Sequence, residues 1–227
     1  MEKSIDLQHL GIIADGNRRW ARERGLPTLE GHRKGLEAIR GLTDAAIEKH
    51  IPYLTFYVFS IENWGRSAEE VSYLMKLAET RIVKYAEKLA QKNTRLLILG
   101  SKTNISPKLA GLLEKAEGIT SECTGTTISM CFNYGGEQEI ADAANIAIKV
   151  EGEISPQNIR KHLYHPEIPD VDMVVRTSGE ERISGFMLWR VAYAELMFME
   201  KFFPEMKGSD IQVILDEYAS RNRRFGK

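Results

Sequence analysis

The sequence predicts an α/β fold, with a six-stranded, mainly parallel sheet flanked by helices, in a single domain over residues 1–227. Short apolar or β-branched runs alternate with longer segments whose apolar residues recur three and four positions apart. This is the pattern of strands alternating with helices. No stretch rich in proline, glycine and serine divides the 227 residues, a length that can bury one sizeable core. Polar residues follow several predicted strands, which places them at one edge of a parallel sheet.

The composition excludes several classes of protein. The net charge of -1 gives no general electrostatic reason to expect a nucleic-acid partner. Cys123 and Cys131 are too few for a disulfide scaffold or a structural zinc site, which favours the reducing cytoplasm. The N-terminal residues lack the apolar core of a signal peptide, and no apolar run is long enough to cross a membrane. We therefore expect a cytoplasmic protein with at most peripheral membrane contact.

The first strand, turn and helix carry the strongest local signal. Residues 10–13 form an apolar run, Asp15-Gly16-Asn17 breaks it, and an arginine-rich helix follows. A carboxylate beside bare helix N–H groups and arginines suits a magnesium-bridged diphosphate, because the carboxylate takes the metal and the donors take oxygens. An ordinary turn with Asn17 as the helix cap is an equal alternative on spacing alone.

The next elements follow from periodicity. Apolar residues three and four apart predict a helix over 36–50, and residues 53–59 are aromatic and β-branched like a buried strand. Ser67 and Glu70 have the spacing of a capping box, which predicts a helix from about 68 to about 92. Its continuous apolar face indicates core packing or, alternatively, the wall of a hydrophobic cleft.

The second half continues the alternation. Ser106-Pro107 and Ser155-Pro156 are typical helix starts, with the cap followed by proline at the first helical position. The remaining predicted strands are 96–99, 126–132, 172–175 and 195–199. The remaining predicted helices are 107–122, 138–150, 156–165 and 210–222, with a possible short element at 187–189.

Donors for anionic oxygen outnumber acids in the loops at the predicted edge. The donors are Arg19, Arg66, Arg176, Arg182, His32, Ser60 and Ser184, and the acids are Asp15, Glu62, Glu180 and Glu195. Each arginine alone is more often a surface or salt-bridge residue. Together they could bind two diphosphates, since guanidinium groups hold phosphate oxygens bidentately.

These residues also form a set of ordered motifs. The motifs are Asp15-Gly16-Asn17-Arg18-Arg19-Trp20, Gly31-His32, the segment 59–66 with Ser60, Glu62, Asn63, Trp64 and Arg66, Asn133-Tyr134-Gly135-Gly136, the segment 176–184, Tyr193-Ala194-Glu195-Leu196 and the terminal Arg224-Phe225-Gly226. From about residue 9 to the C-terminus, the set resembles the cis-prenyltransferases, the undecaprenyl diphosphate synthase family.

The resemblance implies a homodimer in which an apolar tunnel holds a growing isoprenoid. It implies that an allylic prenyl diphosphate is joined to isopentenyl diphosphate with Mg²⁺, forming a Z double bond. By position, Asp15 and Asn63 would be catalytic, and Asp15 and Glu195 would be metal ligands. The implied substrate-binding residues are Gly16, Asn17, Arg18, Arg19, Trp20, Thr28, His32, Ser60, Ile61, Glu62, Trp64, Arg66, Arg176, Arg182, Ile183, Ser184, Arg224 and Gly226.

The chain departs from the family pattern near the head-group site. Thr28 stands where an arginine is usual, Glu137 where the motif ends in arginine, and Gly185 where asparagine is usual. Some relatives of this kind couple prenyl diphosphates irregularly, as in lavandulyl-type head-to-middle joining. Irregular coupling, a non-catalytic subunit and a lipid-diphosphate carrier are therefore alternatives to chain elongation.

Overall fold

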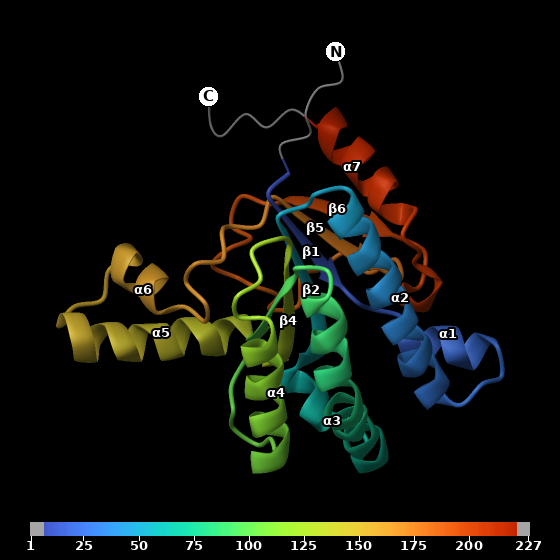
Figure 1. Ribbon diagram of the computed structural model, residues 1–227, viewed down its shortest axis with the longest axis horizontal. Coiled ribbons are helices and arrows are strands. Elements are labelled where there is room, and N and C mark those ends of the chain that lie inside the picture. Colours follow the sequence, from blue (N-terminus) through green and yellow to red (C-terminus); the bar gives the residue numbers. More distant parts are fainter. Residues whose placement is uncertain (1–6, 222–227) are drawn as a thin grey trace.

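The computed structural model describes residues 7–221, which form one six-stranded sheet with flanking helices (Figure 1). Every strand pairing is parallel, so the predicted mainly parallel sheet is confirmed. The strand order is β3-β4-β2-β1-β5-β6. The strands are β1 (His9–Ile13), β2 (Tyr53–Ser60), β3 (Arg95–Leu99), β4 (Thr127–Tyr134), β5 (Met173–Thr177) and β6 (Glu195–Met199).

The helices alternate with the strands as predicted. They are α1 (Asn17–Glu23), α2 (Thr28–Glu48), α3 (Ala68–Ala90), α4 (Pro107–Ile119), α5 (Gly136–Glu151), α6 (Pro156–His162) and α7 (Asp210–Ser220), with short 3₁₀ helices η1 (Ile61–Gly65) and η2 (Phe203–Glu205). Residues 187–189 lie in turns, so the possible element there is absent. Among the described residues, no helix is long and apolar enough to cross a membrane.

One face of the sheet is covered by four helices. Leu42 of α2, Ala86 of α3, Ala116 of α4 and Ile214 of α7 are fully buried in the same core cluster as strand residues such as Leu54. Removing these apolar surfaces from water is the main stabilising contribution to the fold.

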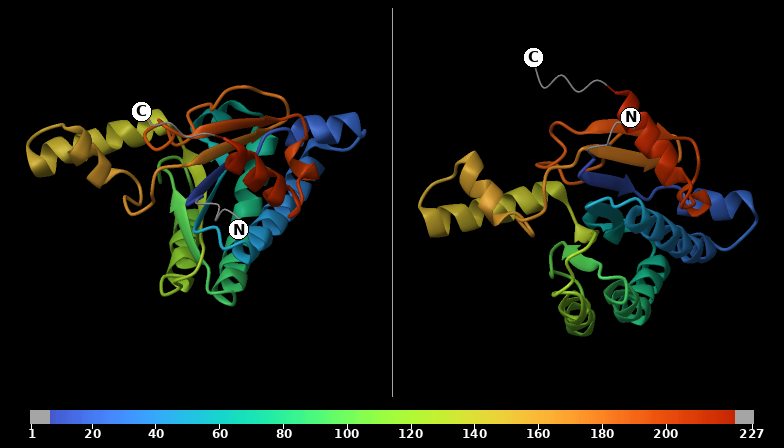
Figure 2. Two further views of the ribbon diagram at one scale, coloured as in Figure 1. Left: turned by 90° about the horizontal axis from the view of Figure 1, so that it is seen from above. Right: turned by 45° about the horizontal axis from the view of Figure 1, so that its top comes forward.

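The opposite face is covered differently. The irregular segment 178–194 packs Phe186 and Met187, both fully buried, into a second core cluster with Ile13 and Tyr57. Helices α5 and α6 pack on each other and lie together to one side of the sheet (Figure 2). The second core therefore depends on loop side chains close to the strand ends.

The helix starts differ from the predictions in three places. Gly16, at φ 101°, is the N-cap of α1, and the Asn17 side chain instead donates to the Ala14 carbonyl at 3.1 Å, so the prediction that Asn17 caps the helix is wrong. Helix α2 begins at Thr28, well before the predicted residue 36. Ser67 caps α3 by accepting from the Glu70 N–H. The Glu70 side chain does not complete the predicted capping box, because it bonds to His32 and Arg66.

The strand order creates a crevice beside β1. The chain leaves β1 towards β2 on one side, and leaves β5 towards β6 on the other, although β1 and β5 are neighbours. Connections that diverge from adjacent parallel strands leave a gap beyond the strands' carboxyl ends, which is the usual ligand position in open α/β sheets.

Candidate functional site

A polar cleft of about 1140 Å³ opens at the carboxyl ends of the strands. Its walls come from the loops after β1, β2, β4 and β5, together with α1 and the start of α2. Most of the predicted site residues line it, and these are Asp15, Gly16, Asn17, Arg18, Arg19, Thr28, His32, Ser60, Ile61, Glu62, Asn63, Arg66, Arg176, Arg182 and Ser184.

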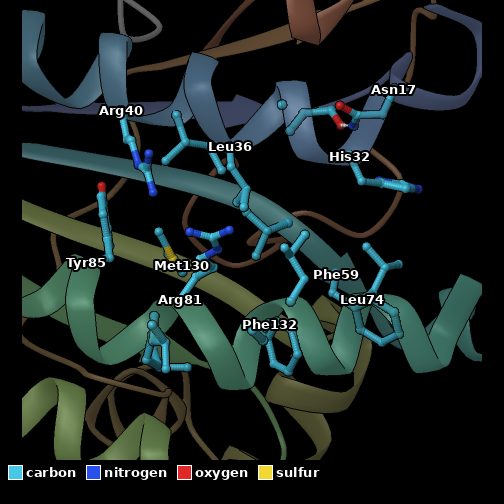
Figure 3. Close-up of a pocket in the computed structure, with 18 of the residues that line it drawn as sticks. Asn17, His32, Leu36, Arg40, Phe59, Leu74, Arg81, Tyr85, Met130 and Phe132 are labelled. Atoms are coloured by element: carbon cyan, nitrogen blue, oxygen red, sulfur yellow. Dashed lines mark hydrogen bonds between the residues drawn. The ribbon is translucent and has the colours of Figure 1, made fainter. Parts of the chain in front are cut away.

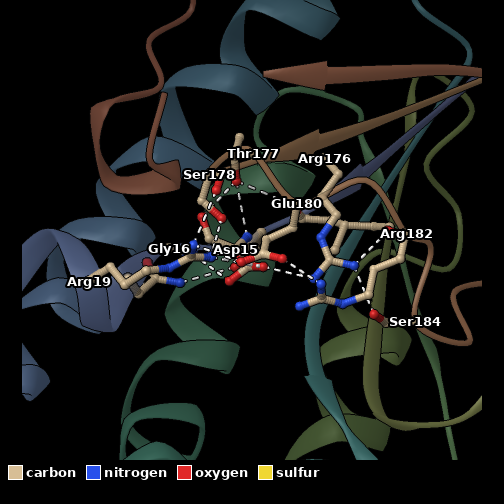
Figure 4. Close-up of polar contacts among 12 residues, drawn as sticks. Asp15, Gly16, Arg19, Arg176, Thr177, Ser178, Glu180, Arg182 and Ser184 are labelled. Atoms are coloured by element: carbon tan, nitrogen blue, oxygen red, sulfur yellow. Dashed lines mark hydrogen bonds and ion pairs between the residues drawn. The ribbon is translucent and has the colours of Figure 1, made fainter. Parts of the chain in front are cut away.

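Asp15 and Arg176 form the centre of this cleft (Figure 4). Arg176 Nη2 donates to Asp15 Oδ2 at 2.8 Å, and Arg176 Nη1 donates to Ser184 Oγ at 2.8 Å. Burial alone would raise the pKa of the Asp15 carboxyl, but the hydrogen bond and charge of Arg176 outweigh burial. The Gly16 N–H and Arg19 act in the same direction, so the pKa of Asp15 lies below its usual value. Asp15 is a carboxylate at neutral pH.

Arg19 and Arg182 meet at Glu180 on the rim of the cleft. Arg19 donates to Glu180 Oε1 at 2.9 Å and to Ser178 Oγ at 2.6 Å, and Arg182 is paired with Glu180 Oε2. The loop turns sharply here, since Ser178 and Gly179 both have positive φ. Carboxylates thus hold the arginines in place, and an incoming diphosphate would exchange with them for the same guanidinium groups.

Glu70 contacts three basic residues of the cleft and was not among the predicted site residues. It is 5% exposed, accepts from Arg66 at 2.8 Å and bonds to His32 Nε2 at 3.0 Å, with Arg18 at 3.7 Å. Burial lowers the pKa of His32 and, with the charges of Arg66 and Arg18, outweighs the opposite effect of Glu70. The only sequence signal at Glu70 was its capping-box spacing from Ser67, which predicted that Glu70 starts a helix and not that it contacts the cleft residues.

Two glycines let α2 approach the turn that carries Asp15. A Cβ on Gly31 would lie 2.0 Å from the Asn17 carbonyl oxygen, and a Cβ on Gly35 would lie 2.5 Å from Asn17 Oδ1. A side chain at Gly31 would therefore displace the turn or the helix. This close approach gives the Gly31-His32 motif a physical reason, because it brings His32 into the cleft.

Asn63 lies in the cleft through the 3₁₀ turn after β2. Its Oδ1 accepts from the Ser60 N–H at 3.2 Å, which fixes the side chain at the start of η1. The adjacent Trp64 faces away, since its Nε1 donates to Asn133 Oδ1 at 2.7 Å and its ring packs on Phe59. Trp64 is thus absent from the cleft lining and supports the turn, and its part in substrate binding stays a prediction.

Three further predicted residues lie outside the cleft lining. The Arg24 guanidinium carbon lies 4.8 Å from the centroid of the Trp20 ring, and Ile183 packs against the second core cluster. Glu195 pairs with Met173 at the start of β5, whereas Arg176 pairs with Ile13 near the other end of the strands. Glu195 and Asp15 of one chain therefore lie near opposite ends of the strands, and their shared role as metal ligands stays a prediction. In this structure Glu195 accepts from Arg221 at 3.0 Å.

The donor set suits a metal that is held partly by substrate. Residues 7–221 contain no group of three or more His, Cys, Asp or Glu that could hold a metal ion. Mg²⁺ is usually bound by one or two carboxylates plus substrate phosphates and waters, so Asp15 alone fits that mode. Within the described chain, the buried Nε of Arg176 and Oδ1 of Asn17 lack hydrogen-bond partners, as expected of a cleft that receives a polar ligand.

An apolar pocket of about 140 Å³ adjoins the cleft between the sheet and helices α2 and α3 (Figure 3). Five residues line both spaces, and these are Ala14, Asn17, His32, Val58 and Phe59. The pocket is a candidate for the predicted tunnel, which itself stays a prediction. The predicted residues Arg224 and Gly226 lie outside the described part of the chain.

Comparison with known proteins gives consistent matches over nearly the full length. The family model described as "Putative undecaprenyl diphosphate synthase" matches residues 13–226. The isoprenyl transferase of Thermotoga maritima is 40% identical over 224 residues, covering 96% of each chain. The crystal structure of lavandulyl diphosphate synthase from Lavandula x intermedia with dimethylallyl diphosphate has a TM-score of 0.93 at 30% identity, covering 99% of this chain and 100% of that one. A probable undecaprenyl diphosphate synthase from Campylobacter jejuni has a TM-score of 0.84 at 29% identity, covering 98% and 99%.

Proposed function

Because this chain belongs to the undecaprenyl diphosphate synthase family of prenyltransferases, we propose that it joins an allylic prenyl diphosphate to isopentenyl diphosphate with Z geometry. One observation carries the proposal. The predicted head-group residues from α1, α2 and the loops after β2 and β5 line one cationic cleft, and an apolar pocket adjoins the cleft at Asn17 and His32. A cleft of this kind accepts the diphosphate end of an isoprenoid, and the pocket accepts its hydrocarbon end.

The cations of the cleft would promote departure of the allylic diphosphate. Arg18 and Arg19 lie on α1, whereas Arg176 lies near the end of β5 and Arg182 in the loop after it. Arg19 and Arg176 both contact Asp15, so these cations could hold two diphosphates beside Asp15. Guanidinium groups fixed in advance stabilise the charge that develops on the leaving oxygen without reorganising. Mg²⁺ bound by Asp15 and diphosphate oxygens would add Lewis-acid stabilisation of the same charge.

The apolar pocket would protect the reacting carbons from water. Phe59, Val58 and Ala14 separate the polar cleft from the deeper pocket, and they would contact the first carbons of the allylic chain. Exclusion of water there prevents hydrolysis of an allylic cation. Asn63, held by the Ser60 N–H, would face the carbons where the proton is lost.

The test is product analysis with purified protein. We expect dimethylallyl, geranyl or farnesyl diphosphate to be extended in five-carbon steps by isopentenyl diphosphate and Mg²⁺, with Z double bonds by NMR. Asp15→Asn should abolish turnover and leave the fold intact by circular dichroism. Asp170→Asn is the matched control, because Asp170 is an exposed ion-pair residue outside the cleft. Unchanged turnover in Asp15→Asn would refute the assigned role of Asp15.

Irregular coupling is the second candidate. Thr28, Glu137 and Gly185, the departures from the family pattern, all line the cleft. The likeness to lavandulyl diphosphate synthase also has a higher TM-score than that to the Campylobacter jejuni protein. Branched products formed from dimethylallyl diphosphate without isopentenyl diphosphate would favour this candidate, and no product with any substrate would favour a non-catalytic subunit.

Magnesium dependence, a homodimer and a cytoplasmic location are the finer parts of the proposal. A metal titration of turnover tests the first, and fractionation of cells tests the third. The homodimer is supported by apolar side chains exposed at and beside the edge strand β6, where Tyr193 is 80% and Leu196 is 37% exposed. We expect a dimer by analytical ultracentrifugation and a monomer after Leu196→Arg.

A further inference from the structure

The apolar pocket changes character at the end farthest from the polar cleft. Asn17 and His32 line the end that meets the cleft, whereas Arg40, Arg81 and Tyr85 gather at the opposite end (Figure 3). Between these ends the walls are almost wholly apolar, and they include Leu36, Ile39, Leu74, Leu77, Ala78, Phe132 and Met130.

The two arginines interrupt the apolar faces of both helices at a similar depth. On α2, Arg40 lies one turn beyond Leu36, and on α3, Arg81 lies one turn beyond Leu77. Arg40 is eight residues beyond His32, which corresponds to about 12 Å along the helix at the α-helical rise. The apolar part of the pocket therefore extends about 12 Å from the cleft.

Neither guanidinium is neutralised. Within residues 7–221, Arg40 and Arg81 make no ion pair or hydrogen bond, and both side chains are exposed. Just past them, the Tyr85 hydroxyl and Thr43 Oγ1 are hydrogen bonded at 2.8 Å, which ties α3 to α2. A hydrocarbon chain that reached this end would have to strip water from two unpaired charges or emerge into solvent, and both are unfavourable.

We propose that Arg40 and Arg81 are specificity-determining residues that stop the growing isoprenoid, so that this enzyme makes a short product. The proposal rests on the proposed function. An isoprenoid repeat has four main-chain bonds and spans about 5 Å when extended, as judged from covalent chain geometry. The 12 Å stretch therefore holds roughly two to three repeats. The product expected is far shorter than an undecaprenyl chain.

The first experiment measures product length. Native protein, Arg40→Leu/Arg81→Leu, Arg40→Lys/Arg81→Lys and the control Lys84→Leu are each supplied with dimethylallyl diphosphate and excess isopentenyl diphosphate. Lys84 is an exposed residue of α3 that does not line the pocket. We expect short products from the native, lysine and control proteins, and products longer by one or more five-carbon units from the double leucine variant. Long polyprenyl products from the native protein, or the same distribution from the double leucine variant, would overturn the proposal.

The second experiment does not require turnover. Binding of prenyl diphosphates of increasing length is measured by calorimetry with the same four proteins. We expect the native affinity to stop rising after about three units. In the double leucine variant, the next unit should add roughly tenfold, since partial burial of five carbons is worth that much. If the affinity of the native protein continued to rise with the length of the prenyl chain, Arg40 and Arg81 would not limit the bound chain. This outcome can be read even if the protein shows no catalysis and the proposed function is wrong.

Discussion

The buried pair of Arg190 and Glu139 supplies a stability prediction with a defined magnitude. Both side chains are fully buried, and Arg190 Nη1 donates to Glu139 Oε1 at 2.8 Å. Arg190 Nη2 donates to the carbonyls of Tyr164 at 2.7 Å and His165 at 3.2 Å. This guanidinium therefore fastens the segment that covers the second face of the sheet to α5.

Arg190→Met removes the charge and keeps most of the apolar volume. Glu139 is then left in the interior with the Tyr134 hydroxyl at 2.5 Å and the Tyr164 N–H at 3.0 Å, but without a countercharge. Stranding one member of a buried ion pair costs about 3–5 kcal/mol. For a domain whose free energy of unfolding is of the order of 5–15 kcal/mol, the midpoint of thermal unfolding should fall by about 10 °C.

The assay is urea unfolding followed by circular dichroism at one fixed protein concentration. Arg160→Met is the matched control, because Arg160 is paired with the exposed Asp170 and such surface pairs contribute about 0–1 kcal/mol. The double variant Glu139→Met/Arg190→Met should recover part of the loss, since no stranded carboxylate remains. If Arg190→Met lost no more stability than Arg160→Met, the buried pair would not hold the two segments together.

Three other predictions concern charges at and near the site. Glu70→Gln removes the countercharge of Arg66 and the charged hydrogen-bond partner of His32. Hydrogen bonds to charged groups are worth about 1.5–3 kcal/mol, so KM for the allylic diphosphate should rise about tenfold with kcat nearly unchanged. An unchanged KM would exclude a positioning role for Glu70. Because the folded-state pKa of Asp15 is lowered, the stability advantage of the native protein over Asp15→Asn should be present above about pH 4 and vanish as pH falls, in urea titrations at several pH values. For His165, burial lowers the pKa but Glu117 and Glu167 outweigh it, so the folded pKa is raised. The stability advantage of the native protein over His165→Gln should be full below about pH 6 and be lost as pH rises through the folded-state pKa of His165. A stability difference that does not change with pH would contradict these ion pairs.

The local pattern of the sequence determined the elements and the edge of the sheet that carries the site. Periodicity and β-branched runs located every strand, and the strand predicted at 195–199 has the same bounds in the structure. Because Asp15 and Arg176 each follow or end a buried parallel strand, the sequence alone placed both at the carboxyl edge. The same reasoning places Glu195, which begins a strand, at the opposite edge, and only the resemblance suggested that it joins Asp15.

Tertiary packing decided which of these groups touch. Asp15 and Arg176 meet because β1 and β5 are neighbours, and strand order is not encoded in the spacing of either strand. The roles of Glu70 and Arg190 were likewise hidden, since each depends on residues far away along the chain. The proposed limit on product length at Arg40 and Arg81 depends on the packing of two helices beside one pocket. Periodicity is a property of neighbouring residues, whereas charge pairing and pocket depth arise from the packing of distant ones.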